Sequence, residues 1–343
     1  MVLDEAQYIK NPLTQVARAA KRLPAGVRFA LTGTPIENRL SELWSIFDFL
    51  MPGLLGTRES FAKRFESPVE HAEGDSAARL QALVSPFVLR RVKEDVVADL
   101  PEKIEDTVMA QLTSEQRKLY LANQDRIAQQ VQHREASEFK KDKLKVLAEL
   151  TKLRQICCDP RLHYADYKAG SAKLDTCMEL VHGALDGGHR ILLFSQFTGM
   201  LDIIGKRLAK EDIAFLKLTG ASSKESRAKM VAHFQAGEAP VFLISLKAGG
   251  VGLNLTAADV VIHYDPWWNV AAQDQATDRA HRIGQQHTVT VYKLIAKDTI
   301  EERIMQMQES KRDLVNSVLG GDGISSALFT REDVLALLGG DGR

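Results

Sequence analysis

The sequence predicts an α/β protein built around a parallel sheet. From residue 189 onward, short apolar runs alternate with stretches of helical pattern, and two shorter runs of the same kind lie near the N-terminus. The later runs span residues 191–194, 214–218, 241–244, 260–264 and 288–296, and the two early ones span 1–3 and 29–31. Apolar runs of about 4–8 residues that alternate with helices are typical of βαβ units in a parallel sheet.

The order of these patterns predicts four segments. Residues 1–50 hold two strands and a largely buried helix at Leu40–Leu50, which is too little for a complete domain. Residues 51–165 read as helices and connectors with no strand, and 166–320 read as a complete α/β domain that should fold alone. Residues 321–343 form a tail with one short helix at 329–338.

Composition indicates an ordinary globular protein and excludes several classes. The 343 residues are 45% hydrophobic and 26% charged, with a formal net charge of zero, so binding to nucleic acid would have to use local basic patches. No apolar run approaches the ~18 residues of a membrane span. Adjacent Cys157 and Cys158, with Cys177, lack the spacing of a zinc site and are expected to be buried, reduced thiols. We expect a cytoplasmic protein, nucleoid-associated if bacterial, with no membrane partner.

The first residues carry an acidic pair at a predicted strand end. Three apolar residues lead directly into Asp4 and Glu5. Ligands of open α/β sheets bind at the carboxyl ends of the strands. Because neighbouring residues at a strand end point in different directions, these two carboxylates can serve two different roles.

The stretch Ser245–Gln285 has a phosphate-binding character. Glycines at 249, 250 and 252 allow the backbone to approach a ligand closely. A helix predicted over 270–282 would place Arg279 and Arg282, three residues apart, on one face. Two guanidinium groups on one face suit phosphate oxygens better than lysines would.

Taken together, these stretches resemble the Snf2 family of superfamily-2 helicase-like ATPases over nearly the whole chain. The motif order carries the resemblance: Asp4-Glu-Ala-Gln7 (motif II), Thr32-Gly-Thr-Pro35 (III), Leu192–Phe197 (IV), Ser245–Thr256 (V), Asp265–Asn269, and Gln275–Gln285 (VI). The segments Pro86–Lys93, Leu100–Lys103 and Leu153–Cys157 resemble the Snf2-specific region between the lobes.

The resemblance implies a complete second RecA-like lobe, preceded by a partial first lobe and a helical Snf2-specific segment. It implies ATP and Mg²⁺ as cofactors. Asp4 would hold Mg²⁺ through water, and Glu5 would orient and deprotonate the attacking water. Arg279 and Arg282 would act as arginine fingers from the second lobe.

It also implies coupling and DNA-binding residues. Nucleotide binding and coupling would involve Gln7, Thr32, Gly33, Thr34, Gly252 and Gln275. Double-stranded DNA would be bound mainly through phosphates, at Ser195, Gln196, Lys247, Gly249, Gly250, Asn254, Thr256, Trp267 and Trp268. Of the two tryptophans, one is expected to touch DNA and the other to pack in the core. We expect His263 and His281 to be hydrogen-bonded structural histidines.

The sequence departs from the family at one important point. No phosphate-binding loop of the form G-x-x-x-x-G-K-[ST] occurs, and the only Gly-Lys pair, Gly205-Lys206, lies within a predicted helix. The family places this loop before motif II. We therefore expect the C-terminal part of an ATP-dependent DNA translocase that could remodel a DNA-bound protein complex. The alternative is a non-catalytic remnant whose second lobe binds only DNA or a partner.

Overall fold

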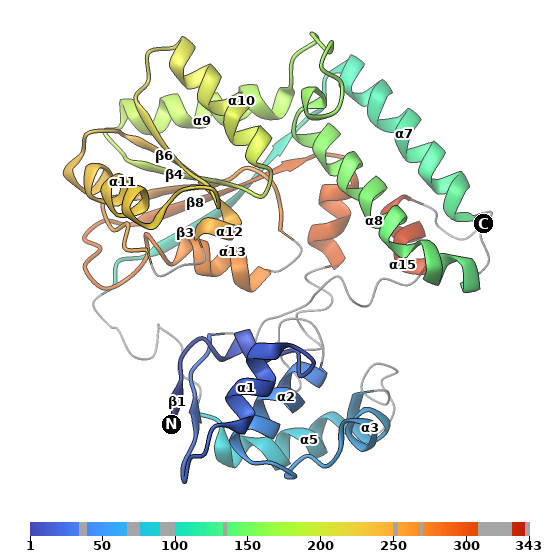
Figure 1. Cartoon of the computed structure of the whole chain (residues 1–343). Coiled ribbons are helices and arrows are strands. Elements are labelled where there is room, and N and C mark those ends of the chain that lie inside the picture. The colour runs from blue at the N-terminus through green and yellow to red at the C-terminus, as the bar shows by residue number, and fades with distance from the viewer. Residues whose placement is uncertain are drawn as a thin grey trace. The chain divides into compact units, whose positions relative to one another are not determined.

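The computed structural model describes residues 1–33, 40–66, 76–89, 100–132, 136–249, 253–267, 270–307 and 331–339. The chain divides into two units (Figure 1). Unit 1 is built mainly from Met1–Val92, and unit 2 mainly from Lys93–Trp267 and Ala272–Gln306. Each unit is described by itself below.

Unit 1 begins with a small parallel sheet. Strand β1 (Val2–Leu3) pairs with β2 (Phe29–Ala30), and the 3₁₀ helix η1 (Ala6–Ile9) and α1 (Gln15–Arg22) lie between them in the chain. The side chain of Thr14 caps α1 by accepting a hydrogen bond from the Ala17 N–H. Both predicted strands are confirmed.

The remaining described segments of unit 1, 40–66 and 76–89, are mainly helical, as predicted. It contains α2 (Leu40–Leu50), α3 (Arg58–Phe61), the π-helix η2 (Ala62–Glu66), α5 (Ser76–Val84) and the 3₁₀ helix η3 (Ser85–Phe87). Their apolar faces share one core, formed by Leu43, Phe47, Leu55, Phe61, Phe65, Leu80 and Val84.

Unit 2 is organised around a six-stranded sheet in which every pairing is parallel. The strand order is β3 (Lys103–Ala110), β8 (Val289–Ala296), β7 (Val260–His263), β4 (Ile191–Ser195), β6 (Val241–Ser245) and β5 (Phe215–Leu218). All five strands predicted after residue 189 are confirmed. Strands β4, β6 and β7 are completely buried because helices cover both of their faces.

One strand corrects the sequence-based division of the chain. Residues 51–165 were expected to contain no strand, yet β3 lies at an edge of the unit 2 sheet and pairs with β8 over eight residues, from Lys103↔Val289 to Ala110↔Ala296. It has no continuous apolar run, because an edge strand exposes part of its surface to solvent. Unit 2 therefore begins near residue 93, well before the predicted boundary at 166.

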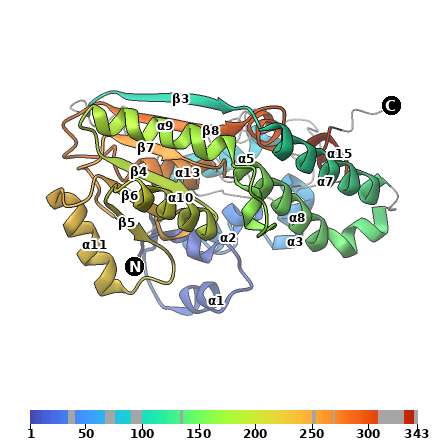
Figure 2. The same ribbon diagram turned by 90° about the horizontal axis from the view of Figure 1, so that it is seen from above.

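Helices cover both faces of the unit 2 sheet (Figure 2). On one face, α9 (Ala172–Asp186) and α10 (Thr198–Lys210) pack on alternate strand residues such as Ile191 and Leu193. On the other face, α11 (Lys224–Ala236) and α13 (Val270–Thr277) pack on Leu192 and Phe194. This alternation is the period-2 pattern of a buried strand.

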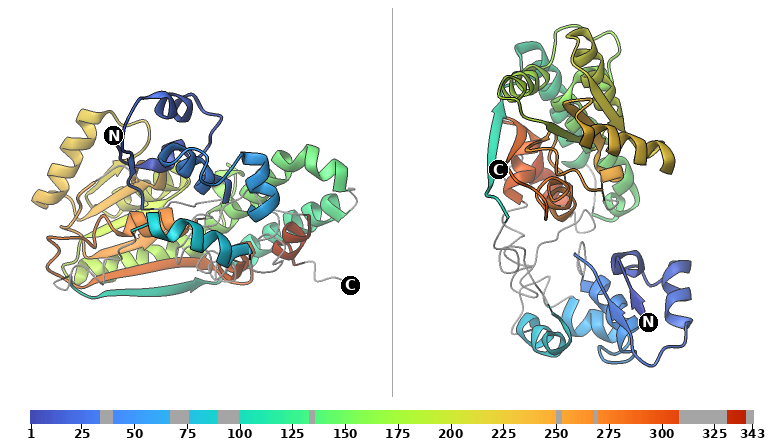
Figure 3. Two further views of the ribbon diagram at one scale, coloured as in Figure 1. Left: turned by 90° about the horizontal axis from the view of Figure 1, so that it is seen from below. Right: turned by 90° about the vertical axis from the view of Figure 1, so that its left-hand side faces the viewer.

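Two long helices, α7 (Ser114–Gln132) and α8 (Ala136–Cys158), run side by side in unit 2 (Figure 3). The short helices η4 (Pro160–Leu162) and α12 (Leu246–Gly249) belong to the same unit, as does α15 (Arg331–Leu337), whose neighbour Leu338 accepts a hydrogen bond from Gln124. Residues 300–307 are helical. No helix among the described residues is long and apolar enough to cross a membrane.

Candidate functional site

The acidic pair of unit 1 lies where β1 ends. The backbone of β2 fixes this end: Leu31 N–H donates to the Leu3 carbonyl at 2.8 Å, and Ala6 N–H donates to the Leu31 carbonyl at 2.9 Å. Asp4 is exposed and Glu5 is half-buried. Because the two strands are parallel, their carboxyl ends lie at the same edge, and Thr32 follows β2 there.

Glu5 adopts a left-handed backbone conformation, with φ 52° and ψ 51°. Such a conformation is uncommon for residues other than glycine and persists where the surroundings enforce it, often at functional sites. Here it turns the chain from β1 into η1. The Asp4 carboxylate accepts a hydrogen bond from the Glu5 N–H at 2.9 Å, which holds the turn.

A hydrogen-bond relay joins the predicted motifs II and III. The Gln7 amide nitrogen donates to Oε2 of Glu5 at 2.6 Å, and the Thr32 hydroxyl donates to Oε1 of Gln7 at 2.8 Å. Oε1 of Glu5 makes no hydrogen bond with any residue that the structure describes. Gln7 therefore fixes one carboxylate oxygen of Glu5 and leaves the other available to a ligand.

The acidic pair fits Mg²⁺ bound together with a nucleotide. Mg²⁺ is usually held by one or two carboxylates, with phosphates and water completing its coordination. Asp4 is an exposed carboxylate of this kind. Within the described part of the chain, no cluster of three or more His, Cys, Asp or Glu could hold a metal by itself. A magnesium ion here would need the phosphates of a substrate.

The two arginines of unit 2 that the sequence predicts to be functional, Arg279 and Arg282, do not share a face of α13, which corrects the predicted helix. Helix α13 ends at Thr277, and Arg279 and Arg282 lie in the turns that follow. The Arg279 carbonyl accepts a hydrogen bond from Leu255 N–H at 3.0 Å, and Nη1 of Arg282 donates to the Leu253 carbonyl at 3.2 Å. Both arginines are thus tied to the loop that follows the glycine-rich stretch.

Gln285 ties the turns that follow α13 to the loop before β7. Its amide nitrogen donates to the carbonyls of Thr256, Ala258 and Ala280, at 3.2, 2.8 and 3.1 Å. Its amide oxygen accepts from the N–H groups of Gln286 and His287. These bonds satisfy backbone groups of both the loop and the turns, so the two segments are held together.

The two histidines have the predicted structural role. His263 is buried, stacks on Phe194 and shares a 2.8 Å hydrogen bond with Thr277. Burial lowers the pKa of His263 to about 3, so it is neutral at ordinary pH. Nε2 of His281 donates to the Pro101 carbonyl at 2.8 Å.

The residues predicted to bind DNA differ in their surroundings. Asn254 is exposed, Thr256 and Gln275 are half-buried, and Trp267 packs partly buried against the core. Ser195 is fully buried, and its hydroxyl donates to Oδ1 of Asp265 at 2.8 Å, so this side chain is already engaged inside the protein. Lys247 and Gly249 belong to α12, at the end of β6. Thr34, Gly250, Gly252 and Trp268 lie outside the described residues.

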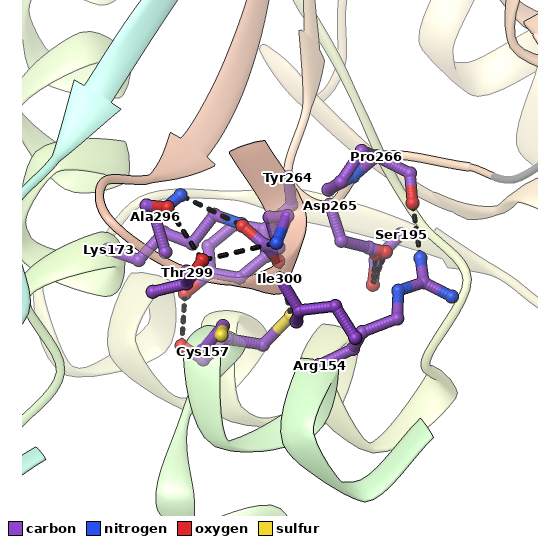
Figure 4. Close-up of polar contacts among 12 residues, drawn as sticks. Arg154, Cys157, Lys173, Ser195, Tyr264, Asp265, Pro266, Ala296, Thr299 and Ile300 are labelled. Atoms are coloured by element: carbon purple, nitrogen blue, oxygen red, sulfur yellow. Dashed lines mark hydrogen bonds and ion pairs between the residues drawn. The ribbon is translucent and has the colours of Figure 1, made fainter. Parts of the chain in front are cut away.

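A buried polar network, whose members Arg154 and Asp265 were not predicted as site residues, underlies the carboxyl ends of β4 and β7 (Figure 4). The guanidinium of Arg154 donates to the Pro266 carbonyl and, at 3.1 Å, to the amide oxygen of Gln196. Asp265 accepts hydrogen bonds from the Ser195 hydroxyl and the Gln196 N–H. Helix α8 is thereby connected to both strand ends.

The same network contains a fully enclosed ion pair. Nζ of Lys173 lies 2.5 Å from Oε2 of Glu301, and both side chains are completely buried. Burial alone lowers the pKa of Lys173, but Glu301 outweighs this effect, so the pKa lies above its usual value. Glu301 also accepts the Ala296 N–H at 2.9 Å, which joins the end of β8 to the helix at 300–307.

A sequence signal for this network does exist. Arg154 lies four residues after Leu150 and four before Cys158, and Lys173 lies four residues before Cys177. At these spacings the charged residue shares a helix face with buried apolar residues. Charged residues are almost never fully buried unless paired, so their place on an apolar face predicts buried partners.

Comparisons with known proteins agree on one family. The model of the SNF2-related domain matches residues 1–162, and that of the helicase conserved C-terminal domain matches residues 172–284. A Mycoplasma pneumoniae protein named uncharacterized ATP-dependent helicase is 41% identical over 98% of this chain and 32% of its own length. The putative ATP-dependent helicase/translocase YwqA of Bacillus subtilis is 42% identical over 96% of this chain and 36% of its own length. The chain thus spans about a third of these relatives.

Solved structures give the same result. The SWI2/SNF2 ATPase core domain of Sulfolobus solfataricus matches with a TM-score of 0.60 and 39% identity, covering 98% of this chain and 70% of that one. The same organism's core in complex with double-stranded DNA matches with a TM-score of 0.56 and 40% identity, covering 93% and 68%.

Proposed function

Because the chain belongs to the Snf2 family of helicase-like ATPases, we propose that it is the C-terminal part of an ATP-dependent double-stranded DNA translocase. Such a protein hydrolyses ATP to move on DNA or to remodel protein–DNA complexes. The observation that carries the proposal is the relay from Thr32 through Gln7 to Glu5. It joins a carboxylate suited to activating water with a residue of motif III.

Each site residue then has a chemical role. Phosphoryl transfer depends mainly on positioning and charge neutralisation. Glu5, whose Oε2 is fixed by Gln7, would use Oε1 to orient the attacking water and accept its proton. Asp4 would hold Mg²⁺, which neutralises phosphate charge when bound. Arg279 and Arg282 would add positive charge at the transferred phosphoryl group, and their bonds to the 253–255 loop support a fixed placement.

The proposed partner is double-stranded DNA, bound mainly through its phosphates, and the proposed location is the cytoplasm. The exposed Asn254 and the backbone of the loop that follows β6 support a phosphate-contacting surface. A DNA-bound protein complex is proposed as a further target. One solved relative is described as a complex with double-stranded DNA.

The catalytic part of the proposal can be tested with a chimaera. The present sequence contains no Walker A loop, so the chain alone should show no DNA-stimulated ATP hydrolysis. Placed directly after the N-terminal part of the Bacillus subtilis relative, it should give hydrolysis that duplex DNA stimulates. That activity should fall by roughly 10³-fold or more with Glu5→Gln or Arg279→Ala. Turnover by the chain alone that Glu5→Gln abolishes would contradict the expected inactivity.

A second candidate is a non-catalytic protein that binds DNA or a partner through unit 2. An inactive chimaera, combined with duplex binding by the chain alone, would establish this alternative. Retained relay geometry and both arginines favour the first candidate.

A further inference from the structure

In the side-chain amide of Gln196, the oxygen has a hydrogen-bond partner, whereas the nitrogen has none among the described residues. Its oxygen accepts a hydrogen bond from Nη1 of Arg154 at 3.1 Å. Its nitrogen, Nε2, is buried and makes no hydrogen bond with any residue that the structure describes. Buried donors without an acceptor are rare in folded proteins and indicate strain, a missing ligand or a functional role.

Arg154 determines the orientation of the Gln196 amide: the oxygen points toward the guanidinium, and the nitrogen points away from it. A guanidinium group carries only donors, so the carbonyl oxygen of the amide must face it. A flipped amide would set its NH₂ group against the guanidinium, with no acceptor between them. The side chain of Arg154 is itself fixed, because it is 1% exposed and also donates to the Pro266 carbonyl.

The backbone of Gln196 is fixed independently. Its N–H lies 3.0 Å from both carboxylate oxygens of Asp265. Asp265 also accepts the Ser195 hydroxyl (Figure 4). Gln196 directly follows β4, which lies between β6 and β7 in the sheet. The carboxyl edge of a parallel sheet is where ligands bind. Main chain and amide oxygen are therefore held at this edge, and only the NH₂ group lacks a partner.

We propose that Arg154 is a positioning residue that orients the Gln196 amide so that its NH₂ group donates to a phosphate oxygen of the bound ligand. The inference rests on the proposed function, in which this unit binds DNA phosphates. A phosphate oxygen is an anionic acceptor, which strengthens the bond to a donor already held in place. The phosphate can belong to the DNA backbone or to a nucleotide, and separate titrations with duplex DNA and with Mg-ATP distinguish them.

The first test uses Gln196→Glu in the full chain. This variant keeps the shape of the side chain and can form an ion pair with Arg154, but it replaces the NH₂ donor with an oxygen. The affinity for a fluorescent duplex of about 20 base pairs at low salt should fall about 10- to 100-fold. The melting temperature should not fall. A purely structural Gln196 would leave duplex affinity within about twofold of the wild type, which overturns the proposal.

The second test isolates Arg154. Arg154→Lys keeps the charge but loses the planar fork that holds two acceptors at once, so duplex affinity should fall about tenfold. In a Gln196→Ala background, the same change should alter affinity by less than about twofold, because both residues act through one amide. Full additivity would overturn the positioning role. Arg207→Lys, which alters an ion pair with Glu211 on α10, is the matched control and should bind as the wild type does.

A spectroscopic measurement separates failure of the inference from failure of DNA binding. In protein labelled with ¹⁵N-glutamine, the Gln196 side-chain amide signal is identified by its loss in Gln196→Glu. It should shift in Arg154→Lys without any ligand and shift again when duplex DNA or Mg-ATP is added to the wild type. An unchanged signal in Arg154→Lys overturns the positioning role, whether or not DNA binds. A response to Mg-ATP alone assigns the phosphate to the nucleotide. No binding of either ligand overturns both the proposed DNA binding and this inference.

Discussion

The two units hold their candidate functional residues in opposite surroundings. In unit 2, strands β4, β6 and β7 are fully buried, and the network around Arg154 and Asp265 is enclosed. In unit 1, the relay of Glu5, Gln7 and Thr32 extends from a sheet of two strands, each of two residues. Apolar residues in and next to that sheet are largely exposed: Val2 by 62%, Phe29 by 58% and, directly after β2, Leu31 by 53%.

This difference shows what makes the site in each unit rigid. A site in unit 2 is held by side chains that cannot move without opening the core. A two-stranded sheet is marginal in water unless other elements cover it. The relay of unit 1 therefore depends on its own hydrogen bonds and on the left-handed turn at Glu5. Unit 2 should resist local opening, whereas the start of unit 1 should not.

The largest expected effect concerns the boundary of unit 2. A fragment of residues 100–343 should unfold cooperatively, whereas a fragment of residues 166–343 should not form a stable fold. The shorter fragment lacks β3, so the eight-residue pairing edge of β8 is left open, and it also lacks Arg154, the buried partner of the Asp265 network. Near-ultraviolet circular dichroism and thermal unfolding measure the difference. Equal melting temperatures would show that β3 and α8 contribute little to this unit.

Hydrogen exchange should show the contrast directly. Amides in β4 and β6 should exchange only through global unfolding, with a free energy of about 5–15 kcal/mol. Amides in residues 1–33 should exchange with opening free energies of only about 0–3 kcal/mol, because few buried contacts hold their sheet. Mass spectrometry of exchange at several times measures both. Slow exchange throughout residues 1–33 would mean that the small sheet is as well protected as the large one.

Removing one partner of the buried Lys173–Glu301 ion pair should strongly destabilise unit 2. Lys173→Met leaves Glu301 charged and enclosed without its partner, so unfolding free energy should fall by about 3–5 kcal/mol. The double variant Lys173→Met with Glu301→Leu should regain most of the lost unfolding free energy, because no charge remains buried. Chemical denaturation followed by tryptophan fluorescence measures each variant. A double variant no better than the single one would indicate that the pair contributes through shape rather than charge.

The sequence predicted the parts of this comparison that depend on local pattern. The five strands after residue 189 follow from continuous apolar runs, and the acidic pair Asp4 and Glu5 lies at the end of β1, as its position after an apolar run predicted. Strand β3 could not be predicted, because its pairing with β8 joins residues nearly 190 positions apart (Lys103↔Val289) and an edge strand has a mixed pattern. The sequence also did not show that the turns after α13 bond to the 253–258 loop, since those contacts join separate segments of the chain.

A smaller effect is expected at β3, the edge strand of the unit 2 sheet. Lowering the pH should reduce the contribution of this strand to the stability of the unit. Burial would raise the pKa of Glu105, but hydrogen bonds from Lys103 and Lys293 outweigh it and lower the pKa to about 2. Since the unfolded value is about 4.3, the ionised group stabilises the fold above that pH. The contribution is lost as pH falls toward about 2.

The measurement is the difference in unfolding free energy between the wild type and Glu105→Gln. It should be below about 1 kcal/mol near pH 6, because the group is partly exposed and screened, and should vanish near pH 2. Glu179→Gln on α9 is the control, since Glu179 is exposed and makes no ion pair with any described residue. A difference that grows on acidification would contradict the assigned ion pairs.

The smallest expected effect comes from removing a helix N-cap hydrogen bond. The same type of bond can be removed from each unit, so the two variants are closely matched. The side-chain oxygens of Thr14 and Ser223 each accept a backbone N–H three residues ahead, at 3.2 Å, at the start of α1 and of α11. Substituting alanine at such a cap costs about 1 kcal/mol. Helix α11 contributes Phe234, fully buried against Phe242, to the main core. Ser223→Ala should therefore lower the cooperative unfolding free energy of unit 2 by about 1 kcal/mol.

Helix α1 packs on the small cluster of Ile9, Ala17, Ala20 and Phe49, so its loss should be felt locally. Thr14→Ala should speed hydrogen exchange within residues 1–33 by about fivefold, the equivalent of about 1 kcal/mol. It should leave the main unfolding transition unchanged. Equal shifts of that transition by both variants would mean that α1 unfolds together with the large sheet. In that case the relay at Glu5 would be as rigidly supported as the network at Arg154.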